Sequence, residues 1–389
     1  MKTKHLFLPL LLLLLSCNSS NKFFSSGTVQ SSQATEEIKI NFVSNLPVCS
    51  VQINGKDYTF LIDTGAPTII SEEIFQELGL QKDYTANVAD SQNNRQKQKF
   101  AMLPNIKIGN LEFQNIGSVV IDLRNGPLKC FGFDGIVGAN LMAKSFWRFN
   151  YQDSTATVAQ KLSAFDVAQY DFSLDFAPKS QKTPVLKGQV ADKNLSFTFD
   201  TGYSGNIEVQ NDYEFYKNIA PKNTFITRQG SSTIGLYGLG ENTQTFEMKS
   251  DVQIDKVSFA GEIVSSGAST LIGNDFLKDY IFVIDWQANK IYLKKNGVPA
   301  PKTLESFGFS YLHIEGKFKV TSLFEEAKVP LKIGDEILKI NDIDLTKPDL
   351  DPCDVIVNKN SKQREKIDIV VKRDQDTLSF QLNKQRLIR

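Results

Sequence analysis

Two aspartates stand in the same local setting at two places in the chain. The first lies in Phe60-Leu-Ile-Asp63-Thr64-Gly65 and the second in Phe197-Thr-Phe-Asp200-Thr201-Gly202. An apolar run that leads into a glycine turn predicts a strand that presents a carboxylate on rigid backbone. Two such carboxylates, if they meet, can activate a water molecule and protonate a leaving group, which is general acid–base chemistry.

The two motifs belong to a longer internal repeat. Asp63 and Asp200 are 137 residues apart, and at the same offset Pro47-Val48 matches Pro184-Val185. Further along, Ile136-Val137-Gly138 matches Leu271-Ile272-Gly273 at an offset of 135. We interpret this as the duplication of a unit of roughly 130 residues.

Other chemistries lack their residues in the repeated region. The only histidines are His5 and His313, so Ser-His, Cys-His and multi-histidine zinc sites are not expected there. We therefore predict no metal and no cofactor. Lys plus Arg (44) equals Asp plus Glu (44) and forms no basic stripe, which argues against a nucleic-acid partner.

The amino terminus predicts export. Residues 1–16 contain Lys2 and Lys4 ahead of an apolar run too short to span a membrane, which is typical of a signal peptide. Leu14-Leu-Ser-Cys17 resembles the bacterial lipobox, which implies a palmitate-bearing, membrane-anchored lipoprotein of the cell envelope lipidated at Cys17. A plain signal peptide with an incidental cysteine is the alternative. The Ser/Asn/Gln-rich residues 17–37 predict a flexible tether.

The elements that would position the aspartates can be read from the pattern. In a first unit, 38–162, Asn54-Gly55 between two apolar runs predicts a hairpin whose second arm ends at Asp63. A second unit, 163–296, repeats this order. Its glycine-rich stretch around Tyr237 predicts either a mobile flap or simple turns, and Tyr237 is a candidate substrate contact.

Apolar-Asp-Thr-Gly twice in one chain, each followed by an apolar-apolar-Gly element, resembles the pepsin/retropepsin-type aspartic peptidases. The resemblance covers about Ile38 to Asn296. It implies an all-β fold of two homologous β-barrel lobes around a peptide-binding cleft, with one catalytic aspartate from each lobe. It also implies that Thr64 and Thr201 hydrogen-bond across the centre to brace the two turns, which Gly65 and Gly202 complete.

The chain departs from the pepsin-like pattern beside both turns. The residue after the glycine is often Ser in that family, but here it is Ala66 in one copy and Tyr203 in the other. We expect both, with Tyr237, to line the substrate cleft. Since two neighbouring carboxylates cannot both ionise, one keeps its proton. The sequence leaves open which aspartate holds it.

Residues 297–302 predict a linker, and 303–389 resemble a PDZ domain, a small α+β fold. Phe307-Gly308-Phe309 matches the loop whose amides hold a peptide carboxyl terminus, and Gly334-Asp335-Glu-Ile-Leu-Lys-Ile-Asn341 is the more specific part of the resemblance. The resemblance implies a C-terminal peptide as a possible ligand.

Three cysteines remain beyond Cys17. Cys49 and Cys130 lie in one predicted lobe and can pair, which would leave Cys353 odd. Separate buried thiols are the alternative.

The sequence thus predicts a monomeric, lipid-anchored aspartic endopeptidase that hydrolyses peptide bonds with Asp63 and Asp200. A non-catalytic peptide-binding lipoprotein is the main alternative. A two-carboxylate glycosidase is the weaker one, because its chemistry requires no Thr-Gly turn after each acid. The natural substrate, the cleavage preference and the membrane face stay open.

Overall fold

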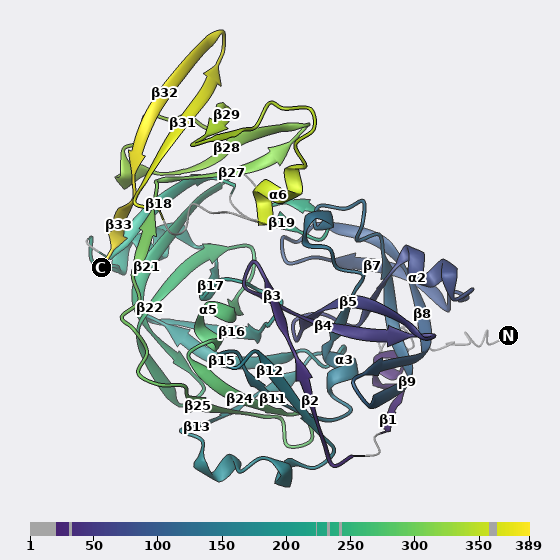
Figure 1. Cartoon of the computed structure of the whole chain (residues 1–389). Coiled ribbons are helices and arrows are strands. Elements are labelled where there is room, and N and C mark those ends of the chain that lie inside the picture. Colours follow the sequence, from purple (N-terminus) through teal and green to yellow (C-terminus); the bar gives the residue numbers. More distant parts are fainter. Residues whose placement is uncertain (1–20, 31–32, 223, 232–233, 241–242, 358–363) are drawn as a thin grey trace, which may run out of the picture.

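The computed structural model describes residues 21–30, 33–222, 224–231, 234–240, 243–357 and 364–389. The described chain is mostly β-strand, arranged as two lobes and a carboxy-terminal unit (Figure 1). The predicted all-β class with two pepsin-like lobes is confirmed.

Lobe 1 is built on a nine-stranded sheet. Its main elements are β4 (Leu46–Ile53), β5 (Lys56–Asp63), β6 (Ile69–Ser71), α2 (Glu72–Glu77), β7 (Tyr84–Ala89), β8 (Arg95–Ile108), β9 (Leu111–Ile121), β10 (Gly135–Gly138) and α3 (Ala139–Met142). The Asn54-Gly55 turn joins β4 to β5 with both residues at positive φ, as a tight hairpin requires. Strand β10 runs parallel to β5 and places Gly138 beside Asp63.

Lobe 2 repeats this arrangement. Its elements are β15 (Pro184–Val190), β16 (Lys193–Phe199), β17 (Ile207–Gln210), α4 (Tyr213–Ile219), β18 (Phe225–Gly230), β21 (Thr243–Ile254), β22 (Val257–Gly267), β23 (Leu271–Ile272) and α5 (Asn274–Leu277). Strand β23 runs parallel to β16, as β10 does to β5. The internal repeat inferred from the sequence is therefore a repeat of structure.

A six-stranded sheet joins the lobes. Its order is β13 (Phe172–Asp175), β25 (Lys290–Lys295), β24 (Tyr280–Asp285), β11 (Phe146–Asn150), β12 (Thr155–Ala159) and β2 (Thr35–Lys39). At its centre Trp147 lies opposite Ile284, and the rings of Phe149 and Phe282 stack 4.8 Å apart. Residues from both lobes thus share one apolar core, which fixes the position of each lobe relative to the other.

The segment 17–37 is not a flexible tether where the structure describes it. Phe24 is buried against the ring of Phe100, and β1 (Thr28–Gln30) pairs with β9. Aromatic burial and strand pairing offset the entropy of ordering this polar stretch. The predicted signal peptide and Cys17 lie outside the described residues. Among the described residues, no helix has the length and apolar character needed to cross a membrane.

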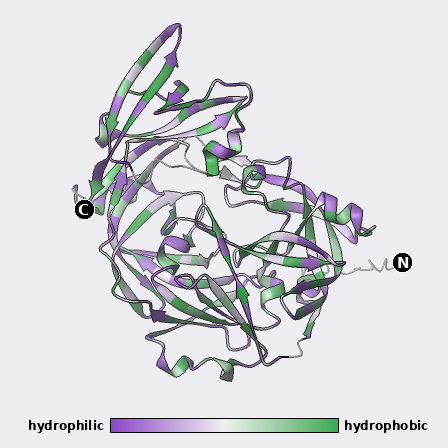
Figure 2. Ribbon diagram, viewed as in Figure 1, coloured by the Kyte–Doolittle hydropathy of each residue, from purple (hydrophilic) through white to green (hydrophobic). Residues whose placement is uncertain are grey.

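The carboxy-terminal unit contains β26 (Leu304–Ser306), β27 (Phe309–Ile314), β28 (Lys317–Phe324), β29 (Glu336–Ile340), β30 (Ile343–Asp344), α6 (Pro352–Val357), β31 (Lys366–Arg373), β32 (Asp376–Asn383) and β33 (Gln385–Ile388). Apolar and polar residues alternate along β32 and the first half of β31 (Figure 2), and Ile367, Ile369 and Val371 of β31 are buried. The unit is not merely tethered by the linker, because β28 pairs with β18 and continues the lobe 2 sheet.

The disulfide pairing differs from the expectation. Cys130, in the 3₁₀ turn η1 (Lys129–Phe131) of lobe 1, is bonded to Cys353 in α6. Cys49 is a free thiol buried in the lobe 1 core, and burial raises its pKa to about 12. A Cys49–Cys130 pair is therefore wrong. The correct partner lies 223 residues away in another structural unit, where sequence spacing gives no signal.

The disulfide should stabilise the whole molecule, because it closes a long loop between lobe 1 and the carboxy-terminal unit. We predict that Cys353→Ser lowers the free energy of unfolding by about 2–5 kcal/mol. A reducing agent should lower the melting temperature of the wild-type protein and leave that of Cys353→Ser unchanged. Equal responses of the two proteins to the reductant would contradict the Cys130–Cys353 link.

Candidate active site

The turns after β5 and β16 bring Asp63 and Asp200 together. Each turn glycine faces the carboxylate of the other lobe: a Cβ added at Gly65 would lie 2.6 Å from the Asp200 carboxylate, and one at Gly202 would collide with that of Asp63. Both positions need glycine because no side chain fits there. The strand-to-turn geometry thus places two carboxylates, one from each half of the repeat, in a single site.

Two threonines fasten the turns to each other. The amide of Thr64 donates to Thr201 Oγ1 and the amide of Thr201 donates to Thr64 Oγ1, both at 3.0 Å. The two hydroxyls donate in turn to Phe199 O at 2.6 Å and Ile62 O at 2.8 Å, across the lobe boundary. Both threonines are fully buried, so each polar group has a partner where water cannot replace it.

The backbone solvates the two carboxylates unequally. Asp63 Oδ1 accepts the amides of Gly65 at 2.7 Å and Ala66 at 3.0 Å. Asp200 Oδ1 accepts the amide of Gly202 at 2.8 Å, and the amide of Tyr203 points instead at the Asp200 main-chain oxygen, 3.3 Å away. Since amide donors stabilise the ionised form, Asp63 is the better carboxylate of the two.

The pKa values of Asp63 and Asp200 differ in the direction that these hydrogen bonds predict. Burial raises the pKa of Asp63, while the Gly65 amide, a hydrogen bond from Asp200 and the Ala66 amide oppose the rise. The pKa of Asp200 is raised well above its ordinary value, first by burial and then by the negative charge of Asp63. We therefore assign the shared proton to Asp200, the carboxyl whose pKa is raised more strongly. The pair holds one base and one acid at the same pH.

Two hairpin tips from opposite lobes meet, one between β7 and β8 and one at Tyr237 between β19 (Ile234–Gly235) and β20 (Gly238–Leu239). Asp90, at the tip between β7 and β8, accepts the amide of Tyr237 at 2.9 Å. Asn93 Nδ2 donates to Ala268 O at 3.4 Å and Ser269 Oγ donates to Ser91 O at 2.8 Å. Tyr237 packs against the cluster of lobe 1 that Ala66 also contacts. The lobe 2 stretch around Tyr237 thus reaches the first lobe.

The remaining predicted cleft residue, Tyr203, is directed inward. Its ring lies over Gly205 and Gly273, and its hydroxyl hydrogen-bonds to the buried Glu208 on β17. Burial raises the pKa of Glu208 to about 7. Glu208 was not predicted as a site residue. The one signal in the sequence was its position between two apolar residues, Ile207 and Val209.

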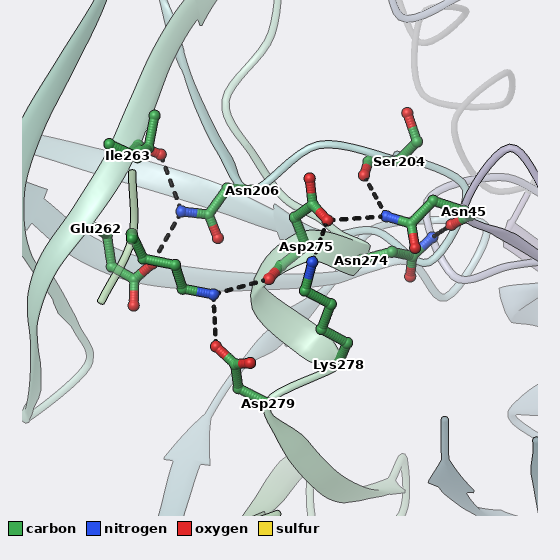
Figure 3. Close-up of polar contacts among 10 residues, drawn as sticks. Asn45, Ser204, Asn206, Glu262, Ile263, Asn274, Asp275, Lys278 and Asp279 are labelled. Atoms are coloured by element: carbon green, nitrogen blue, oxygen red, sulfur yellow. Dashed lines mark hydrogen bonds and ion pairs between the residues drawn. The ribbon is translucent and has the colours of Figure 1, made fainter. Parts of the chain in front are cut away.

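A polar network behind the Asp200 turn was also missed (Figure 3). Asn45, in the turn between β3 (Asn41–Val43) and β4 of lobe 1, donates to Ser204 O at 2.6 Å and to Asp275 Oδ1 at 3.2 Å. Asn274, the first residue of α5, donates to Asn45 O at 2.9 Å. Single asparagines in loops carry no sequence signal for such a role.

The predicted carboxylate loop of the carboxy-terminal unit lies apart from the dyad. Gly308 has φ +88° and Phe309 begins β27. Among the described strands β27 pairs only with β28. The Gly308 amide is engaged by Ser306 Oγ at 3.0 Å, and a peptide carboxylate would have to displace that contact.

No group of three His, Cys, Asp or Glu side chains suited to a metal ion occurs within the described ranges. A family model described as aspartyl protease matches residues 49–141. The match covers Asp63 and its turn and supports a protease function for this chain. A search of curated proteins finds no match.

The raised pKa of Asp200 makes stability depend on pH. A protonated Asp200 favours the fold, and this contribution is lost as pH rises through its folded-state pKa. Asn resembles the protonated acid, so Asp200→Asn should melt close to wild type near pH 4 and about 2 °C or more above it near pH 8.

Differential scanning calorimetry at the two pH values checks this, with exposed Asp57→Asn as the control. If the melting temperatures of Asp200→Asn and wild type differ by the same amount at both pH values, ionisation of Asp200 does not destabilise the fold.

Proposed function

We propose that this protein is an aspartic endopeptidase in which Asp63 and Asp200 hydrolyse peptide bonds. One observation carries the proposal: two half-buried carboxylates from equivalent turns of two lobes lie in one site, where burial raises the pKa of both, and reciprocal threonine hydrogen bonds hold their turns together. The chain has no histidine within the repeat.

The difference in pKa between Asp63 and Asp200 assigns the base and acid roles in peptide hydrolysis. Asp63, ionised, removes a proton from a water molecule between the carboxylates, and the resulting hydroxide attacks the peptide carbonyl carbon. Asp200 gives its proton to the carbonyl oxygen, so that a neutral diol forms. The proton on Asp63 then passes to the departing nitrogen while Asp200 takes one back from the diol, and the C–N bond breaks. The dyad ends in its starting protonation state.

Replacing either acid should abolish turnover. We predict that Asp63→Asn and Asp200→Asn each reduce cleavage at least about 10³-fold, because each removes a group that transfers protons in the rate-limiting chemistry. The assay incubates protein with a diverse peptide mixture and identifies products by mass spectrometry. Wild-type-like activity in Asp200→Asn would contradict the mechanism.

The same assay distinguishes the peptidase from a non-catalytic peptide-binding protein. The hairpin tips that already bond to each other through Asp90 and Tyr237 also suit a protein that captures peptides without cutting them. Peptides retained by the wild-type protein but recovered intact at every pH between 3 and 8 would favour that peptide-binding role, and the dyad would then be a structural remnant.

The carboxy-terminal unit is proposed to be a PDZ domain that binds the C-terminus of a peptide along β27, with Phe307, Gly308 and Phe309 around the carboxylate. The pairing of β27 with β28 alone among the described strands and the positive φ of Gly308 support this. Peptides with a free carboxylate should bind at least about 10-fold tighter than their C-terminal amides. Equal affinities in isothermal titration calorimetry would remove the assignment.

Membrane anchoring is proposed from the sequence alone. Lipidation of Cys17, preceded by Leu14-Leu15-Ser16, would hold the enzyme as a monomer at the membrane of the cell envelope. We predict that Cys17→Ala moves the protein from the membrane fraction to the soluble fraction, since acyl chains supply the affinity. Retention of Cys17→Ala in the membrane fraction would contradict it.

A further inference from the structure

One peptide unit behind Asp200 is hydrogen-bonded at both ends. Its amide, on Gly202, donates to Asp200 Oδ1 at 2.8 Å, and its carbonyl oxygen, on Thr201, accepts Asn274 Nδ2 at 2.8 Å. A carbonyl that accepts a hydrogen bond polarises its peptide and makes the attached N–H a stronger donor. Asn274 therefore acts on the Asp200 carboxylate without touching it.

The first lobe contains a matching arrangement. The peptide between Gly65 and Ala66 donates its amide to Asp63 Oδ1 at 3.0 Å, and its carbonyl oxygen accepts the hydroxyl of Thr183 at 3.1 Å. Thr183 is fully buried and precedes β15, so it reaches the first turn from lobe 2. Each carboxylate thus accepts a hydrogen bond from one peptide N–H whose carbonyl oxygen is itself hydrogen-bonded to a side chain.

The orientation of the Asn274 amide is fixed by its partners. Its oxygen accepts the hydroxyl of Tyr151 at 3.0 Å, while its nitrogen donates to Asn45 O and Thr201 O. Both of those are carbonyl oxygens, which only accept, so a flipped amide would lose these two hydrogen bonds and keep at most the one to the Tyr151 hydroxyl. Asn274 is fully buried, and no water can restore them.

Both supports cross the boundary between the lobes. Thr183 of lobe 2 holds the turn of Asp63, whereas Tyr151 and Asn45 of lobe 1 hold the amide that serves the turn of Asp200. Asn45 adds a contact to Ser204 O in the same turn (Figure 3). The acidity of each carboxylate therefore depends on the lobe that does not carry it.

We propose that Asn274 and Thr183 are positioning residues that set the acidities of Asp200 and Asp63, each through a single peptide unit. The inference rests on the proposed function, in which those acidities divide the acid and base roles. Loss of either support weakens a donor to an ionised carboxylate and raises the pKa of that carboxyl.

The other ionisable groups around the dyad are few. Tyr151 and Glu208 both lie near Asp200, and Tyr203 lies against Glu208. Tyr151 and Tyr203 have pKa values raised well above the ordinary tyrosine value, chiefly by burial, and stay neutral. Glu208 can titrate near neutrality, so Glu208→Gln is needed as a background in which any shift is remeasured.

The test compares pH–rate profiles of kcat/KM. Asn274→Ala should move the upper limb, loss of the proton from Asp200, to higher pH by about 0.2–0.6 unit. Thr183→Val should move the lower limb, protonation of Asp63, to higher pH by a similar amount and leave the upper limb in place. Both shifts should persist in the Glu208→Gln background.

Matched controls separate this role from a purely structural one. Asn140 is a buried asparagine of α3 that binds Thr68 and Gly117 rather than a dyad peptide. Asn140→Ala and Thr68→Val should lower the melting temperature as much as the test variants while leaving both limbs in place. Unmoved limbs in Asn274→Ala and Thr183→Val, or equal shifts in the controls, would overturn the proposal.

A second measurement needs no substrate. Carbon-13 NMR titration of the aspartate carboxyls should show the pKa of Asp200 raised in Asn274→Ala, and also, less strongly, in Tyr151→Phe, which removes only one hydroxyl. If the wild-type protein cleaves nothing but these pKa shifts occur, the proposed function fails and the positioning role stands. If it cleaves peptides and they are absent, the positioning role fails alone.

Discussion

Two carboxylates in one partly buried site cannot both be charged, and the rest of the structure is arranged around that constraint. Burial and mutual repulsion would drive Asp63 and Asp200 apart if their turns were free to move. The reciprocal hydrogen bonds of Thr64 and Thr201 prevent this. The proton that the pair must keep is what makes it able to act as acid and base together. The closeness of the two carboxylates thus accounts both for their mutual repulsion and for their ability to act as acid and base.

The duplicated fold is nearly symmetric, but its chemistry is not. Equivalent strands and turns deliver the two aspartates, yet Asp63 receives two amide hydrogen bonds and Asp200 receives one. The difference begins at the residue after each glycine, Ala66 in one copy and Tyr203 in the other, because the Tyr203 amide is directed away from the carboxylate. A duplicated unit gains separate acid and base functions through such local divergence.

Much of the fold could be predicted from local sequence patterns. The Asn54-Gly55 hairpin and the paired Asp-Thr-Gly turns follow from turn chemistry and strand periodicity, so they could be predicted. The partner of Cys130, the pairing of β28 with β18 and the burial of Phe24 could not, because each joins segments far apart in the chain. The unequal solvation of the aspartates is likewise a matter of amide directions, which residue types alone do not specify.

The central claim, that water activated by a two-lobe dyad attacks the peptide bond directly, can be tested in a single turnover in ¹⁸O-labelled water. The account predicts one ¹⁸O atom in the new carboxyl terminus of the first product molecule and none in Asp63 or Asp200, read by mass spectrometry of product and digested enzyme. Label in either aspartate would mean that the carboxylate itself had attacked the substrate, and would contradict the account.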